Sequence, residues 1–262
     1  MERKSVRFYD TEKDKQMEIF RKMSFADSTG DAIPFYHEGK YHIFSLTSPP
    51  GTTVYPERLR TTWSHSISDD LVHWQELPTA LYPGEGDEPD ASGVWTGSVI
   101  YGEGQYHAFY TGYCLTAEFQ QTICHATSDD GITWTKDIAN PVITPMTELY
   151  EKLDWRDPYV FYNEEDENYW ILISARRLDM PVTRRGCIVL YRSKNLKDWT
   201  YYGPIYSPGH TNCPECPEMY KMGGHWYLSY SRFSEFVNTI YRVSESPFGP
   251  WRKPKKDGIG GR

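Results

Sequence analysis

Three carboxylic acids stand out in this sequence of 262 residues because of their surroundings. Most acidic residues lie in polar turns, but Asp31, Asp157 and Glu215 lie among Pro, aromatic and apolar residues, in the stretches GDAIPFY, WRDPYVF and CPECPEMY. Carboxylates that are brought together repel one another, so such a cluster is costly unless it has a function. Two functions suit it. One is the binding of a hard cation such as Ca²⁺. The other is glycoside hydrolysis, in which one carboxylate attacks carbon or activates water and another protonates the leaving oxygen.

Aromatic residues near these acids favour a sugar ligand. Trp63, Trp95, Trp155, Tyr36 and Tyr159 are expected to lie near the same strand ends as the acids. Aromatic rings offer flat apolar platforms on which sugar rings stack, and the same residues are equally suited to a hydrophobic core. The sequence leaves both roles open for each of them.

Two cysteines flank one of the acids in the stretch NCPECPEMY. Cys213 and Cys216 have the spacing of a metal or redox pair, but the sequence has no second Cys or His pair to complete a zinc site. We therefore expect Glu215 to be the functional residue of this stretch. Cys216, one position later on a strand, is expected to point to the opposite face and to pack against a neighbouring sheet, and Cys213 is expected to have no function of its own.

An internal repeat defines the fold. Each repeat contains a Ser, a polar turn and a Trp, and each of these turns follows a strand of alternating aromatic and aliphatic residues such as GKYHIFSL or GQYHAFYTGY. The four turns are SDDLVHW (68–74), SDDGITW (128–134), SKNLKDW (193–199) and SESPFGPW (244–251). This pattern predicts an all-β propeller built from blades of four strands.

The repeats predict a single domain over residues 1–262, with blades at about 31–90, 91–150, 151–210 and 211–258. A propeller closes its ring, so we expect either an incomplete fifth blade or a contribution of residues 1–30 to the closure. The first strand of each blade lines the central channel. Asp31, Asp157 and Glu215 each begin such a strand, so they are expected to occupy equivalent positions and to converge there.

Composition excludes several other classes of function. The formal net charge is −8, and no dense cluster of basic residues is present, which argues against a nucleic-acid partner. No run of 18 apolar residues suggests a membrane span, and the first residues lack the apolar core of a signal peptide. Five cysteines, an odd number in a large chain, fit reduced thiols. We therefore expect a cytoplasmic protein.

The motifs GDAIPFYHEGKYHIF, WSHSISDDLVHW, GVWTGSV, WRDPYVF and ECPEMY occur in this order in the chain. Together they resemble glycoside hydrolase family 32, the β-fructosidases that include invertases, inulinases and levanases, from about Gly30 to Trp251. The Arg156-Asp157-Pro158 and Glu215-Cys216-Pro217 elements carry the resemblance most specifically. It implies a five-bladed propeller, of which four blades are clear here, and no C-terminal β-sandwich is evident.

The resemblance also implies a mechanism: retaining hydrolysis of terminal β-fructosyl units, with Asp31 as nucleophile and Glu215 as general acid and base. Asp157 would bind fructose hydroxyls and stabilise the transition state, with Arg156 beside it. No metal or organic cofactor is implied. The residues expected to contact substrate are Arg156, Trp63, Trp95, Tyr36 and Ser98.

The expected substrate is sucrose or a short fructo-oligosaccharide. Gly30-Asp31-Ala32-Ile33-Pro34 replaces the usual Asn-Asp-Pro-Asn, and Phe44-Ser45-Leu46 replaces Phe-Tyr-Gln, as in the branch of the family with an Ile-Pro-Phe-Tyr motif. Two alternatives remain open. The chain could be a catalytically impaired sugar-binding propeller or a homo-oligomer that associates through an open edge. It could also be an inverting pentosidase like those of family 43, with Asp31 as base.

Overall fold

The computed structural model describes residues 26, 28–52, 54–232 and 238–259, and these residues form four antiparallel sheets of four strands each. The first blade comprises β1 (Thr29–His37), β2 (Lys40–Thr47), β3 (Thr62–Ser68) and β4 (Trp74–Leu81), and the second comprises β5 (Gly93–Gly102), β6 (Gln105–Tyr113), β7 (Gln121–Ser128) and β8 (Thr135–Lys136). The third comprises β9 (Tyr150–Asn163), β10 (Asn168–Arg177), β11 (Gly186–Ser193) and β12 (Thr200–Tyr206), and the fourth comprises β13 (Glu215–Met222), β14 (His225–Ser231), β15 (Thr239–Ser244) and β16 (Gly258–Ile259). Two short 3₁₀ helices, η1 (Glu57–Leu59) and η2 (Val182–Arg184), lie in loops. The all-β propeller architecture with four blades is thus confirmed.

The repeated Ser–Trp segments are the turns between the third and fourth strands of the blades. In the first turn the Ser68 hydroxyl accepts the Leu71 N–H at 2.9 Å, while Asp70 Oδ1 accepts the Val72 and His73 N–H groups at 2.9 and 2.7 Å. Asp130 in the second blade and Asn195 in the third accept the equivalent pairs of N–H groups. The segment recurs because a short Asp or Asn side chain can accept the backbone N–H groups of its own turn.

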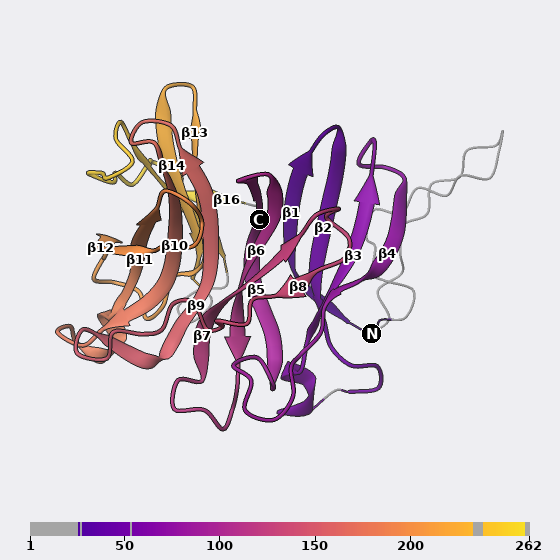
Figure 1. Cartoon of the computed structure of the whole chain (residues 1–262). Helices are drawn as coiled ribbons and strands as arrows, with labels where there is room; N and C mark the ends of the chain where they lie inside the picture. Colours follow the sequence, from indigo (N-terminus) through magenta and orange to yellow (C-terminus); the bar gives the residue numbers. More distant parts are fainter. Residues whose placement is uncertain (1–25, 27, 53, 233–237, 260–262) are drawn as a thin grey trace, which may run out of the picture.

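The blades pack face to face in chain order. The innermost strand of each blade contacts the next one, β1 with β5, β5 with β9 and β9 with β13 (Figure 1). Three hydrophobic clusters fill the interfaces: Ile33, Phe44, Trp63, Val94 and Tyr110 between the first two blades; Phe109, Ile123, Trp155, Ile171 and Ile173 between the second and third; and Trp170, Leu172, Ile188, Met219, Leu228 and Ile240 between the last two. Burial of these side chains supplies the main driving force for the arrangement.

The two ends of this array differ from its interior. Close packing of the kind that joins successive inner strands does not link β13 to β1 within the described ranges. The fifth blade implied by the resemblance is not among the four sheets that these residues form. The predicted contribution of residues 1–30 to ring closure falls largely on 1–25 and 27, which lie outside the described residues.

Candidate active site

A β-bulge interrupts the inner strand of every blade, near the first residues of β1, β5 and β13 and in the middle of the longer β9. The register shifts between Gly30 and Ala32 in β1, between Val94 and Gly97 in β5 and between Glu215 and Glu218 in β13, and β9 shifts opposite Leu172 and Ser174 of β10. A bulge inserts an extra residue and turns side chains away from the normal alternation. The four bulges therefore direct side chains toward a common space.

Backbone dihedrals mark the bulges and correct one expectation. Asp31, Asp157 and Cys216 have positive φ angles of 27°, 55° and 48°. L-residues adopt this region rarely, in turns and at functional sites. In the fourth blade the residue equivalent to Asp157 is therefore Cys216, and Glu215 is equivalent to Arg156. The expectation that the three acids occupy equivalent positions is wrong for Glu215, because it precedes its bulge residue by one position.

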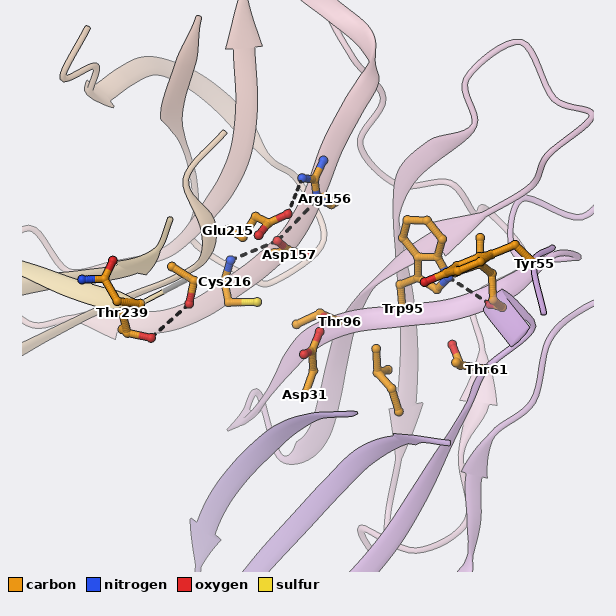
Figure 2. A pocket seen from close by; sticks show the side chains of 14 residues that line it. Asp31, Tyr55, Thr61, Trp95, Thr96, Arg156, Asp157, Glu215, Cys216 and Thr239 are labelled. Carbon is orange, nitrogen blue, oxygen red and sulfur yellow. Dashed lines mark hydrogen bonds and ion pairs between the residues drawn. The ribbon is translucent and has the colours of Figure 1, made fainter. Parts of the chain in front are cut away.

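The bulges surround a cavity of about 700 Å³, which all four blades line (Figure 2). Its lining residues are Asp31, Leu46, Tyr55, Leu59, Thr61, Trp95, Thr96, Arg156, Asp157, Glu215, Cys216, Ser231, Asn238 and Thr239. The three predicted catalytic acids thus face one pocket although they are far apart in the sequence. Cys216 also lines this pocket, which corrects the expectation that it packs against a neighbouring sheet, because the bulge turns it to the same side as Glu215.

Each of the three carboxylates has a different set of partners. Asp31 Oδ2 accepts a hydrogen bond from the Thr96 hydroxyl of the second blade. Asp157 Oδ2 accepts the Cys216 N–H at 3.0 Å and lies 3.7 Å from Arg156 Nε. Glu215 Oε1 lies 3.0 Å from Arg156 Nη2, and Figure 2 shows this guanidinium beside both Glu215 and Asp157. Asp31 has no such ion pair among the described residues.

Burial dominates the electrostatics of Asp157, whose side chain is only 6% exposed. Loss of solvation is the main cause that raises the pKa of this carboxyl; Arg156 and the Cys216 N–H lower it, the negative charges of Asp31 and Glu215 raise it, and the net pKa is about 6. Asp157 is therefore ionised at neutral pH and becomes protonated in mild acid.

Two hydroxyl groups of the second blade form hydrogen bonds with backbone N–H and C=O groups at the bulges. The Thr111 hydroxyl donates to the Thr96 carbonyl at 2.9 Å and accepts the Asp157 N–H at 2.8 Å. Ser98 donates to the Pro158 carbonyl and accepts the Val160 N–H, both at 2.8 Å. These bonds join the second blade to the third at the base of the pocket and hold the backbone at Asp157 in its unusual conformation.

Of the residues expected to contact substrate, Arg156 and Trp95 line the pocket. The Trp95 ring stacks on Tyr113 at 4.1 Å between ring centroids, and its Nε1 donates to the Leu59 carbonyl at 3.0 Å. These contacts fix the ring at the wall of the cavity. Trp95 therefore remains the candidate platform for a sugar ring.

Other predicted contact residues are placed elsewhere. Trp63 has no exposed surface and donates from Nε1 to the Trp95 carbonyl at 2.9 Å, so it supports the pocket wall from within the core. Ser98 is 6% exposed, and its hydroxyl is used by the two backbone groups of β9. Both predictions of substrate contact are wrong, because neighbouring blades cover these side chains.

Tyr36 is also wrongly predicted to contact substrate. It is 58% exposed and packs against Tyr41 with tilted rings at the far end of β1, about 16 Å along the strand from Asp31. Trp155 is fully buried, and Tyr159 packs against the core between the third and fourth blades. Of the five aromatic residues considered as sugar platforms, only Trp95 lines the cavity.

The sequence also contained a signal for one pocket residue that was not predicted. Thr96 follows Trp95 in GVWTGSV, and both lie at the bulge of β5, as Asp31 lies at the bulge of β1. Thr61, Leu59 and Tyr55, from the long loop between β2 and β3, carried no comparable signal, because a loop has no repeating pattern.

Across the described ranges, no three or more His, Cys, Asp or Glu side chains are grouped so that they could hold a metal ion. The same ranges contain no helix with the length and apolar character needed to cross a membrane. All five cysteines are free thiols, and four of them are buried.

Comparison with known proteins supports the resemblance. Residues 31–249 match the model "Glycosyl hydrolases family 32 N-terminal domain". A levanase of Bacillus subtilis is 33% identical over 198 residues, covering 71% of this chain and 26% of that protein. A raffinose invertase of Escherichia coli is 32% identical over 202 residues, covering 74% of this chain and 39% of that protein. The chain thus spans well under half the length of these two relatives.

Solved structures resemble the propeller. Fructan 1-exohydrolase IIa from Cichorium intybus aligns with a TM-score of 0.70 at 25% identity, over 84% of this chain and 42% of that one. An exo-inulinase from Aspergillus awamori aligns with a TM-score of 0.68 at 26% identity, over 89% of this chain and 50% of that one.

Proposed function

The chain belongs to glycoside hydrolase family 32, and on this premise we propose that it releases terminal β-fructosyl units from sucrose or short fructo-oligosaccharides by a retaining double displacement. The observation that carries the proposal is the meeting of Asp31, Asp157 and Glu215 at one cavity, with Arg156 paired to Glu215. The names of the levanase, the raffinose invertase and the fructan exohydrolase support a fructoside as substrate.

In the first step Asp31 attacks the anomeric carbon of the fructosyl unit. The bond from that carbon to the leaving oxygen breaks, and Glu215 transfers a proton to the departing sugar. In the second step Glu215, now ionised, takes a proton from water, the water oxygen attacks the same carbon, and Asp31 leaves as a free carboxylate. The Thr96 hydroxyl, which donates to Asp31 Oδ2, orients this carboxylate for attack.

Asp157 would stabilise the positively charged transition state, and Arg156 would support it. As an ionised, buried carboxylate, Asp157 can accept hydrogen bonds from fructose hydroxyls as positive charge develops on the ring. Arg156 lies between Asp157 and Glu215, so it reduces the repulsion between these two acids. The Trp95 ring offers a platform at the wall of the same cavity.

Incubation with sucrose, 1-kestose, inulin and aryl arabinosides tests the proposal. Release of fructose, with the β-anomer formed first by NMR, supports a retaining fructosidase. Release of arabinose with inversion would instead support a pentosidase of the family 43 type, in which Asp31 acts as base. Binding of fructosides without turnover would support the sugar-binding alternative.

Two variants locate the chemistry. Asp31→Ala and Glu215→Ala are each expected to lower kcat by about 10⁴-fold or more without unfolding the protein, since each removes a reacting group. Glu245→Ala is the control, because Glu245 lies exposed directly after β15 of the same blade and does not line the cavity. Near-complete activity of either variant would contradict the assigned roles.

Self-association through the open end of the array is a second proposal. The face of the fourth blade that is turned away from the third carries Tyr220 stacked on Tyr227 at 5.5 Å, and Tyr220 is 38% exposed. Analytical ultracentrifugation tests it, and a monomer over a wide concentration range would exclude it. The free thiols support a cytoplasmic location, which stays a prediction that cell fractionation would test.

A further inference from the structure

A network of side chains with alternating charges begins at Glu215 and leads away from the pocket through the third blade. Arg156 contacts Glu215 through Nη2, and its Nη1 lies 2.6 Å from Asp154 Oδ1. The other oxygen of Asp154 lies 3.4 Å from Nε of Arg176, on the adjacent strand β10. One carboxylate therefore joins the pocket arginine to a second arginine that does not line the cavity.

In this network, Arg176 is held by several contacts besides the one with Asp154. Its side chain is only 7% exposed, and its Nε lies 2.7 Å from Glu151 Oε2. Its Nη1 donates to the Asn212 carbonyl at 2.8 Å, and its Nη2 donates to the Val182 carbonyl at 3.1 Å. The guanidinium is thus fixed by groups from three separate segments of the chain.

Glu151 also pairs with Arg185, which is the outer end of this network. Burial alone would raise the pKa of Glu151, but hydrogen bonds from Arg176 and Arg185 outweigh it and hold the pKa below its ordinary value. Glu151 therefore stays ionised above mildly acidic pH and keeps Arg176 in place. The complete order is Arg185, Glu151, Arg176, Asp154, Arg156 and Glu215.

The geometry matters because Arg156 has several possible partners. Its fork reaches Asp154, Asp157, Glu215 and, at 3.3 Å, the side-chain oxygen of Gln121 from β7. A long side chain with this many acceptors needs a fixed attachment if one orientation is to dominate. Asp154 provides it, since its contact is the shortest of the four.

We propose that Asp154 and Arg176 are positioning residues for the hydrolysis: Arg176 fixes Asp154, and Asp154 fixes Arg156 so that its guanidinium faces Asp157 and Glu215 from one side. This inference rests on the proposed fructosidase function. Neither residue touches the cavity, so both act through Arg156. A small displacement of a group that orients substrate can cost about 10²-fold in rate.

Loss of this support should also change the titration of Asp157. The charged groups that face Asp157 are Arg156 on its own strand, Asp31 from β1 and Glu215 from β13, and the Cys216 N–H donates to it. Only Arg156 supplies a positive side-chain charge among them. When Arg156 moves away, the pKa of Asp157 rises, and the acid limb of the activity profile moves to higher pH.

Asp154→Asn is the principal test. It keeps the shape of the side chain but removes its charge, and we expect kcat/KM for the best fructoside to fall about 10- to 100-fold. The acid limb is expected to move upward by about one pH unit. Asp179→Asn is the matched control, because Asp179 forms an exposed pair with Arg177, next to Arg176 on β10, and is not connected to the pocket. Activity and acid limb of Asp154→Asn equal to those of Asp179→Asn would overturn the proposal.

Arg176→Lys provides a second test if Asp154→Asn does not fold. Lysine keeps the charge but cannot make all of the arginine contacts at once, so a folded Arg176→Lys protein should lose activity, and full activity would overturn the proposal.

Carbon-13 NMR of the Asp157 carboxyl, assigned with Asp157→Asn, separates this inference from the function. A raised pKa in Asp154→Asn supports the positioning role even if no fructoside is cleaved. An unchanged pKa, together with unchanged pocket geometry, contradicts it.

Discussion

Buried titratable groups occur in two regions of this protein, and the two regions treat them in opposite ways. At the pocket, Asp157 and Glu215 lie against Arg156 as an ion-pair cluster. Inside the first two blades the buried groups are histidine pairs. His42 Nδ1 lies 3.0 Å from His65 Nε2, and His107 Nδ1 lies 2.9 Å from His125 Nε2, with stacked rings in both pairs. One region keeps its groups charged, and the other keeps them neutral.

The pKa values show what this difference means for stability. Burial raises the pKa of Asp157 to about 6, whereas it lowers that of His65 to about 3 and that of His107 to about 4. Between about pH 4 and pH 6 the native state holds an extra proton at Asp157, so this group makes stability fall as pH rises. The unfolded state holds extra protons at the histidines below pH 6.5, so these groups make stability rise with pH. At neutral pH the ionised Asp157 therefore costs stability, whereas the histidines cost stability only below about pH 6.5.

The two tryptophans on either side of the pocket wall give the largest expected contrast. Trp63→Ala should lower the free energy of unfolding by about 3–5 kcal/mol, because Trp63 is fully buried between the first and second blades. Trp95→Ala should mainly raise KM, with a smaller loss of stability, because Trp95 lines the cavity. Urea unfolding and steady-state kinetics of both variants measure this. Equal destabilisation by the two changes would remove the distinction between pocket and interior.

Asp157→Asn tests whether the charge of the pocket is functional. We expect kcat/KM to fall about 10²- to 10³-fold, because the acceptor that meets the sugar hydroxyls loses its charge. In the wild type, activity should fall as pH decreases through about 6, where Asp157 becomes protonated. The variant should be as stable as the wild type or more stable at pH 7, because it removes a charge that is costly to bury. A clear loss of stability with little loss of activity would contradict this.

The histidine pairs should control stability in mild acid. Between pH 7 and pH 5, His65 and His107 should each cost about 2 kcal/mol of unfolding free energy, since each ring can be protonated readily only in the unfolded state. Denaturant unfolding at a series of pH values checks this. His65→Phe, which preserves the stack on Phe44, should flatten the curve in this range. A variant curve as steep as that of the wild type would contradict the assignment.

The smallest expected effect on stability and activity is that of removing the Thr111 hydroxyl, which joins the second blade to the third. Thr111→Val removes the bridge between the Thr96 carbonyl and the Asp157 N–H, which should cost about 1–2 kcal/mol in stability and also lower kcat. Thr122→Val is the matched control. Thr122 lies on β7 opposite Gly112 of β6 and is also buried, and among the described residues it forms no hydrogen bond to the third blade. Equal effects of the two changes on kcat would show that the bridge does not support the site.

Much of the fold could be predicted from local patterns. The Ser–Trp turns and the alternating strands around them depend only on neighbouring residues, so their repetition is sufficient to predict four blades. The motif order predicted Asp31, Asp157 and Glu215 at the starts of inner strands. The structure places all three at the cavity, but Asp157 lies in the middle of β9, because this strand begins seven residues earlier, at Tyr150. The loop residues Tyr55 and Leu59 could not be predicted, because their position depends on how the first blade packs against the second.

The strands, the turns and the three acids follow from patterns of a few residues and from motifs of fixed order, so they can be predicted from the sequence. Which side chains face the pocket depends on tertiary contacts between distant segments. The bulge in β13 turns both Glu215 and Cys216 toward the cavity. Packing of blade on blade buried Trp63 and left Trp95 at the wall. The pairing of adjacent strands brought Arg176 to Asp154, and through it to Arg156, a relation between distant segments that no local pattern records.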